Sequence, residues 1–112
     1  MIPAPNNIHI TRNASFIQEY HLYDGTGAEM NMNGYEIYAQ VWTANKVRKL
    51  ADFTIQWVDK STGKFILYLS AEDTNNVTSV GFWDLLVVSP GGTSDYWIRG
   101  KTVLTAGYTV HG

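Results

Sequence analysis

Hydrophobic and polar residues alternate with a period of two through most of the chain, which is typical of β-strands with one buried face. The alternation covers residues 8–11, 16–23, 35–42, 53–58, 64–69, 80–88 and 96–104. Turn-forming residues separate these segments, as in Asp24 to Gly27, where glycine adopts a positive φ without penalty. We therefore expect an all-β fold, an antiparallel sandwich of about seven strands.

One hairpin and one helical turn stand out in this pattern. Residues 53–58 and 64–69 flank a turn that ends at Gly63, which predicts a hairpin. Ser70 then provides a hydroxyl N-cap, and Glu72 and Asp73 place acids in the first turn, where they suit the helix dipole. We expect one short helical turn that links two strands.

The chain of 112 residues has the size of one domain, and we expect a single sandwich over residues 1–112 with its core at about 8–105. Tryptophans at positions 42, 57 and 83 are expected to fill the space between the sheets, since each buries about 200 Å².

Composition excludes several classes of protein. Charged residues make up 16% of the chain, against about 25% in an average domain, and the net charge of -2 excludes a basic nucleic-acid footprint. The absence of cysteine excludes disulfides, thiolate zinc sites and cysteine nucleophiles. Residues 1–7 lack the pattern of an export signal, and the longest apolar run, residues 85–88, is far too short for a membrane helix. We expect neither nucleic acid nor membrane as a partner.

Candidate metal and nucleophile sites are weak. His21 has Asp24 three residues later and could lie near His9, while His111 is next to the last residue, but no spacing typical of zinc ligands is present. The serines at positions 61, 89 and 94 lie in turns, and none is part of a nucleophile elbow. We expect no metal and no cofactor.

Carboxylates offer the remaining catalytic possibility. A glycosidase pair is conceivable from Glu36, Asp84, or Glu72 with Asp73, but a domain of this size rarely builds a cleft around such a pair. Asp84 is the most unusual acid because it interrupts an apolar strand. It is interpreted as an outward-pointing residue or as an acceptor of backbone N–H groups, and we expect no enzymatic activity.

Three strands carry apolar side chains on both faces. If Ile37, Leu67 and Leu85 face the core, their neighbours in sequence face outward, where a one-sided sheet normally has polar residues. The expected outward residues, a candidate protein interface, are Tyr38, Trp42, Ile66, Tyr68, Phe82, Leu86 and Val88. Two alternatives stay open. In the first, this surface is not exposed, because loops cover it or because one strand faces the other way. In the second, the aromatic residues at positions 38, 42 and 68 bind carbohydrate by stacking on sugar rings.

Several short motifs occur in a familiar order. They are Asn33-Gly34-Tyr35 before an alternating strand, Thr62-Gly63 before another, Trp83-Asp-Leu85, Pro90-Gly91 and Gly100-Lys-Thr-Val103. Over about residues 8–105 the chain resembles a family of small immunoglobulin-like domains in tailed bacteriophages, including the N-terminal domain of baseplate upper and fibre-like proteins. It departs from that pattern at residues 12–15, in what the resemblance implies is a first hairpin.

The resemblance implies an immunoglobulin-like sandwich and a non-enzymatic structural role in the virion, after assembly in the host cytoplasm. The leading expectation is a capsid decoration or cement protein that bridges neighbouring capsid subunits, because the chain ends where such a domain ends. The alternatives are a tail, baseplate or fibre-attachment adaptor and a carbohydrate-binding module. Expected partners are the major capsid protein or a tail or baseplate protein, together with self-association in a symmetric assembly.

Overall fold

Alternating sequence segments become β-strands in the computed structural model, which describes residues 4–106. In chain order the strands are β1 (Ala4–Pro5), β2 (Ile8–Thr11), β3 (Phe16–His21), β4 (Glu36–Thr43), β5 (Lys49–Asp52), β6 (Thr54–Asp59), β7 (Lys64–Leu69), β8 (Gly81–Val88) and β9 (Ser94–Thr105). A 3₁₀ turn, η1 (Lys60–Thr62), joins β6 to β7, and one helix, α1 (Ala71–Asn75), follows β7.

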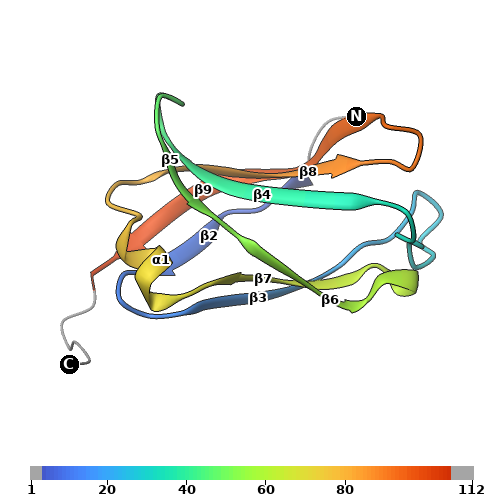
Figure 1. Ribbon diagram of the computed structural model, residues 1–112, viewed down its shortest axis with the longest axis horizontal. Helices are drawn as coiled ribbons and strands as arrows, with labels where there is room; N and C mark the ends of the chain where they lie inside the picture. The colour runs from blue at the N-terminus through green and yellow to red at the C-terminus, as the bar shows by residue number, and fades with distance from the viewer. Residues whose placement is uncertain (1–3, 107–112) are drawn as a thin grey trace.

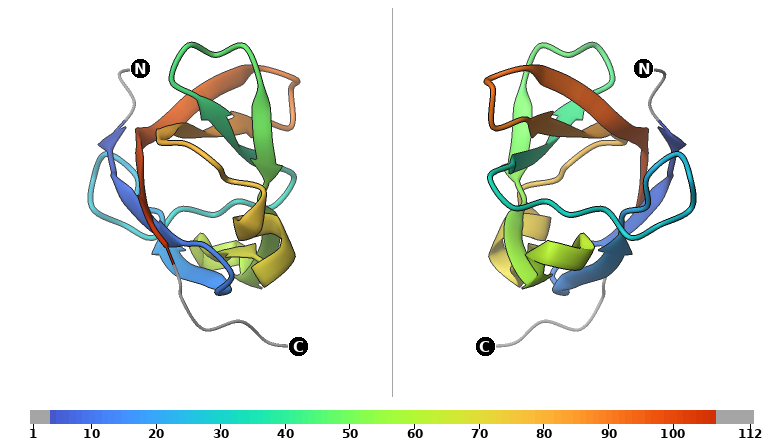
Figure 2. Two further views of the ribbon diagram at one scale, coloured as in Figure 1. Left: turned by 90° about the vertical axis from the view of Figure 1, so that its left-hand side faces the viewer. Right: turned by 90° about the vertical axis from the view of Figure 1, so that its right-hand side faces the viewer.

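The strands form two sheets that pack face to face (Figure 1). The large sheet has the order β1–β9–β8–β4–β5, with β2 pairing further along the same edge of β9, and the small sheet has the order β3–β7–β6. Seen from its two ends, the molecule shows these sheets as separate layers (Figure 2). In Figure 1, β5 runs diagonally from the upper, large sheet toward β6 in the lower, small sheet.

This arrangement is that of an immunoglobulin-like sandwich. The third, sixth and seventh strands form one sheet, while the fourth, eighth and ninth form the core of the other, with β5 added beside β4. The expected fold class, an all-β immunoglobulin-like sandwich with one short helical turn, is therefore confirmed.

The inward positions of the alternating strands build the core. Ile37 and Val41 of β4, Leu67 of β7, and Trp83 and Leu85 of β8 all lie between the sheets and are nearly inaccessible to solvent. Aromatic rings extend this core in a chain with centroid separations of 5.4–5.9 Å, linking Phe16, Phe53, Trp83, Tyr20, Phe65 and Trp57.

A kink between β1 and β2 covers the buried tryptophan. The indole N–H of Trp83 donates to the carbonyl of Asn6 at 2.8 Å, and the Tyr20 hydroxyl donates to the Asn6 side-chain oxygen at 2.8 Å. The kink passes directly over Gly100 of β9, where a Cβ atom would lie only 1.7 Å from the Asn6 carbonyl oxygen. Glycine is required at this position because the backbone of residues 6 and 7 occupies the space of a side chain.

The predicted hairpin and helical turn are both confirmed. β6 and β7 pair in antiparallel register on either side of η1, and Gly63 adopts a φ of 75° at the end of the turn. Ser70 caps α1: its side chain accepts from the Asp73 N–H at 3.0 Å, and the Asp73 carboxylate accepts from the Ser70 N–H at 3.2 Å. This reciprocal capping box begins the helix at the expected residue.

The implied first hairpin is wrong. β2 and β3 belong to different sheets, and the turn at residues 12–15 carries the chain from one sheet to the other. β2 pairs in parallel with β9, so that Ile8 lies opposite Thr102, and β1 pairs with the same strand in the same direction. The sandwich is therefore not purely antiparallel.

Two further details differ from the sequence expectation. The pattern missed β5, because Leu50 and Ala51 are consecutive and both buried and thus break the alternation. Of the three tryptophans expected between the sheets, Trp83 is buried there and Trp57 packs partly against the core, but Trp42 lies on the outer face of the large sheet. The end of the chain, residues 107–112, lies outside the described residues, as does His111.

The contact above Gly100 yields a stability prediction. Gly100→Ala forces the kink at Asn6 away from β9 and is expected to lower the free energy of unfolding by about 2 kcal/mol. Gly91→Ala is the matched control, because the nearest atom to a Cβ there is the Ser89 hydroxyl at 4.0 Å. Urea unfolding followed by tryptophan fluorescence measures both, and equal stabilities of the two variants would contradict the role given to Gly100.

Candidate functional site

Five of the seven predicted interface residues share the outer face of the large sheet. Cross-strand register places Tyr38 opposite Leu86 and Trp42 opposite Phe82, with Val88 opposite Glu36 at the end of the same face. Tyr38 is 50% exposed, and the other four side chains are partly exposed. We name these residues, Tyr38, Trp42, Phe82, Leu86 and Val88, the large-sheet patch.

The remaining two predicted residues lie on the opposite side of the molecule. Ile66 and Tyr68 project from β7 on the outer face of the small sheet, where Tyr68 pairs with Ile17 of β3. Ile17 is 65% exposed and was not singled out from the sequence. We name Ile17, Ile66 and Tyr68 the small-sheet patch. The outward orientation holds on all three strands, and the seven predicted residues divide between two surfaces.

An open groove with a volume of about 430 Å³ lies beside Trp42 and Phe82 of the large-sheet patch. Its walls include the aromatic side chains of Trp42, Phe82 and Tyr96, and its polar side chains are Gln40, Lys46, Asp84 and Arg99. The register explains this mixture, because Gln40 of β4 lies opposite Asp84 of β8, which lies opposite Arg99 of β9. A polar row thus runs across the sheet between the pair Tyr38 and Leu86 and the pair Trp42 and Phe82.

Asp84 points outward into this groove, which is one of its two predicted orientations. Its side chain is 34% exposed, and Arg99 Nη2 lies 3.9 Å from its Oδ2. Burial raises the pKa of the Asp84 carboxyl above its usual value, while the charges of Arg99 and Lys46 act in the opposite direction. The groove thus holds a carboxylate that is incompletely solvated and only loosely paired.

Neighbouring side chains fix the orientation of the aromatic rings. The Trp42 indole N–H donates to Gln40 Oε1 at 3.0 Å, and the Arg99 guanidinium lies 5.5 Å from the centre of the Tyr96 ring. The Tyr38 hydroxyl donates to Glu36 at 2.7 Å, and this hydrogen bond raises the pKa of Tyr38. Such a site can bind a molecule that presents an apolar ring face together with hydroxyl or amide groups.

Sequence reasoning missed four groove residues: Gln40, Lys46, Tyr96 and Arg99. A register shift between Leu85 and Leu86 explains why Tyr96 and Arg99 escaped notice. Because of this bulge, residues three positions apart reach the same face of β9, whereas strict alternation would place them on opposite faces.

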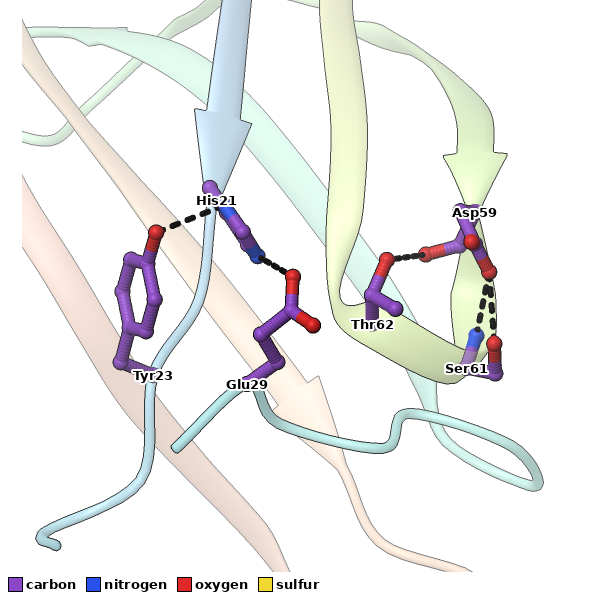
Figure 3. Close-up of polar contacts among 6 residues, drawn as sticks. All are labelled: His21, Tyr23, Glu29, Asp59, Ser61 and Thr62. Carbon is purple, nitrogen blue, oxygen red and sulfur yellow. Dashed lines mark hydrogen bonds and ion pairs between the residues drawn. The ribbon is translucent and has the colours of Figure 1, made fainter. Parts of the chain in front are cut away.

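The histidines considered as metal ligands contact neighbouring residues of the fold. His21 contacts the Tyr23 hydroxyl at 2.8 Å through Nδ1 and Glu29 at 2.9 Å through Nε2 (Figure 3). Neither contact involves Asp24 or His9, the two residues considered as neighbours in a metal site. This cluster fixes the loop after β3, where residues 23 and 29 also form an isolated β-bridge. His9 instead contacts the Thr105 hydroxyl.

Two aspartates and two serines stabilise turns. Asp24 accepts hydrogen bonds from Thr26 and Ala28, and Asp59 accepts from the backbone N–H and hydroxyl of Ser61 (Figure 3). These hydrogen bonds lower the pKa of Asp24 and Asp59. The hydroxyl of Ser89 accepts from the backbone N–H of residue 93.

Within residues 4–106, no group of three histidine or acidic side chains is close enough to hold a metal ion. No helix in that part of the chain is long and apolar enough to span a membrane.

The raised pKa of Asp84 predicts a pH dependence of stability. The folded state binds this proton more tightly than the unfolded state, so the carboxylate favours folding less as the pH rises through its titration. Relative to Asp84→Asn, the wild-type protein is expected to lose stability as the pH rises from the usual aspartate pKa of about 4 through the raised pKa of the folded state. Urea unfolding at several pH values measures the difference, and a constant difference between the two proteins would contradict the expectation.

Comparisons with known proteins found similar solved structures but no family for the chain. No family model matches the chain, and no curated protein matches it. Among solved structures, the chain is similar to the filamin domain of Lin-41, with 12% sequence identity and a TM-score of 0.48. The similarity covers 88% of this chain and 84% of that domain.

Proposed function

We propose that this domain is a non-enzymatic structural protein of a bacteriophage virion, which decorates the capsid and bridges neighbouring subunits. The observation that carries the proposal is the presence of apolar patches on both outer faces of the sandwich. Tyr38 is 50% exposed on one face, and Ile17 is 65% exposed on the other. The order of sequence motifs that resembles phage immunoglobulin-like domains supports the virion as the setting.

Two opposed patches suit a bridging role. Because they lie on different sheets, one partner can cover the large-sheet patch while a second covers the small-sheet patch. Burial of apolar surface contributes about 25 cal/mol per Å², and repetition around a symmetric shell multiplies contacts that are individually small. A tail, baseplate or fibre-attachment adaptor would use the same two faces and is the alternative location.

Virions of the phage that encodes the chain provide the direct test. Mass spectrometry of purified particles is expected to find the domain in many copies, and cryo-electron microscopy is expected to place it between capsid subunits. Density on the tail would select the adaptor instead, and absence of the chain from purified virions would overturn both.

Single charges on the two patches test the bridging geometry. Tyr38→Glu and Tyr68→Glu are each expected to reduce occupancy on particles at least tenfold, since a buried unpaired carboxylate costs more than about 1.4 kcal/mol. Val47→Glu is the matched control, because Val47 is 76% exposed in the loop between β4 and β5. Unchanged occupancy for Tyr68→Glu would show that the domain attaches through one face alone.

The groove favours a second candidate function, binding of a carbohydrate. Trp42 and Tyr96 offer aromatic surfaces for a sugar ring, while Gln40, Asp84 and Arg99 offer donors and acceptors for its hydroxyl groups. This combination occurs on the large sheet, within the same groove.

A glycan array distinguishes this function from purely structural binding. Under the carbohydrate hypothesis, selective binding is expected and is lost in Trp42→Ala. Tyr68→Ala is expected to retain it, because Tyr68 lies on the other sheet. Absence of selective binding by the wild-type protein would contradict the carbohydrate hypothesis.

A further inference from the structure

Strand β3 forms a free edge of the small sheet. Among the described residues, β3 pairs with β7 and with no other strand, so its outer side has no strand partner. A row of unpaired backbone N–H and C=O groups is a template on which another strand can add.

The other sheet edges carry features that oppose such pairing. The edge formed by β1 and β2 contains Pro5 and is interrupted by the kink at Asn6. β5 has only four residues, and its terminal Lys49 and Asp52 form an ion pair at 2.8 Å. A register shift after Trp57 disturbs β6. Short strands, charges, prolines and bulges are the usual protections of an edge.

β3 has the fewest of these protections. Its pairing with β7 is continuous from Phe16 to His21, without a register shift, and the six residues include no proline, lysine or arginine. Glu19 is its only acidic residue, and the exposed Ile17 projects beside it on the outer face. Among the described edges, that of β3 is therefore the least protected.

The hydrogen bonds at its end show which backbone groups face outward. Just beyond β3, the N–H of Leu22 donates to Gly63 on the side of β7. Since the direction alternates along a strand, the backbone groups of Gln18 point toward β7 and those of Ile17 and Glu19 point to the free edge. The side-chain amide of Gln18 donates to the Glu19 carbonyl at 3.3 Å, as expected for a carbonyl that β7 does not use.

We propose that two copies of this chain associate through antiparallel pairing of β3 with β3, about a two-fold axis at Gln18. In this register Ile17 lies opposite Glu19 of the second copy, and each exchanges N–H and C=O hydrogen bonds with the other. The two Gln18 side chains meet on the axis, where each amide can donate to and accept from the other. The product is a continuous six-stranded sheet.

Side-chain direction and charge exclude the two registers next to this one. A shift by one residue would place inward side chains opposite outward ones. A two-fold axis at Glu19 would also align the free backbone groups, but it would place two carboxylates directly opposite each other, which is destabilising. With the axis at Gln18, Phe16 lies opposite Tyr20 of the second copy on the inner face. The strand is thus complementary to itself, which identifies a second copy as the occupant.

This association goes beyond the proposed virion role, because it uses a strand edge and not the two outer faces. It places the small-sheet patches of both copies on one surface. If the two copies do not associate, the proposed virion function is unaffected. If the chain is absent from virions, the association of two copies is likewise unaffected.

Cysteine scanning tests the register, because the chain contains no cysteine of its own. With the axis at Gln18, the Cα atoms of the two copies at this position are about 4.5 Å apart, within disulfide range. Gln18→Cys is therefore expected to give a covalent dimer on mild oxidation. Glu19→Cys is expected to remain monomeric, since its diagonal separation is about 7–8 Å. Gln56→Cys, on the edge strand β6, controls for random collisions. The proposed register would be overturned if Gln18→Cys did not cross-link faster than Glu19→Cys and Gln56→Cys.

A proline variant tests the pairing itself. Ile17→Pro removes an N–H that points away from β7 and places a ring on the free edge, so the sandwich is expected to remain folded while pairing is blocked. Ile17→Thr retains the N–H and the β-branched shape. Sedimentation equilibrium is expected to show a concentration-dependent doubling of mass for the wild type and for Ile17→Thr, and its loss for Ile17→Pro. A wild-type protein that stays monomeric, or an Ile17→Pro variant that still doubles in mass, would overturn the proposal.

Discussion

The buried indole N–H of Trp83 is the constraint on which the arrangement of the sandwich depends. Trp83 is 1% exposed, and an unsatisfied donor at such a position costs about 1–3 kcal/mol. The Asn6 carbonyl satisfies it, so the chain must kink between β1 and β2 directly over β9. The same residue donates its N–H to the Arg99 carbonyl and accepts from Tyr20 of the small sheet. One asparagine thus joins the first strand, the core tryptophan and both sheets.

Aromatic contacts connect the sheets where antibody domains use a disulfide. In those domains the bridge joins the second and sixth strands of the constant-type sandwich, B and F. The corresponding strands here are β3 and β8, and their residues Tyr20 and Trp83 lie with ring centroids 5.9 Å apart. Burial raises the pKa of Tyr20 to about 12, so its hydroxyl remains a hydrogen-bond donor to Asn6 throughout the physiological range. The core therefore needs neither cysteine nor an oxidising compartment for its cross-connection.

The alternation of hydrophobic and polar residues predicted the features that depend on a single strand. It identified the buried face of β4, β7 and β8, and local capping residues identified the hairpin turn and α1, because these features involve neighbours in sequence. It could not predict that β2 pairs with β9, since nothing in residues 8–11 specifies a parallel partner more than ninety positions later. It also could not assemble the groove. The bulge in β9 brings Tyr96 and Arg99 to one face, and only register places Asp84 beside Arg99.

Three of the ten acidic residues stabilise local backbone structure. Asp24, Asp59 and Asp73 each accept backbone N–H groups, at 2.8, 3.1 and 3.2 Å, and so stabilise turns or the helix start. The lowered pKa values of Asp24 and Asp59 have the same origin. These three carboxylates act on loops and on the helix start. By contrast, Glu36, Asp84 and Arg99 belong to strands and face outward on the large sheet, where they are available to a partner.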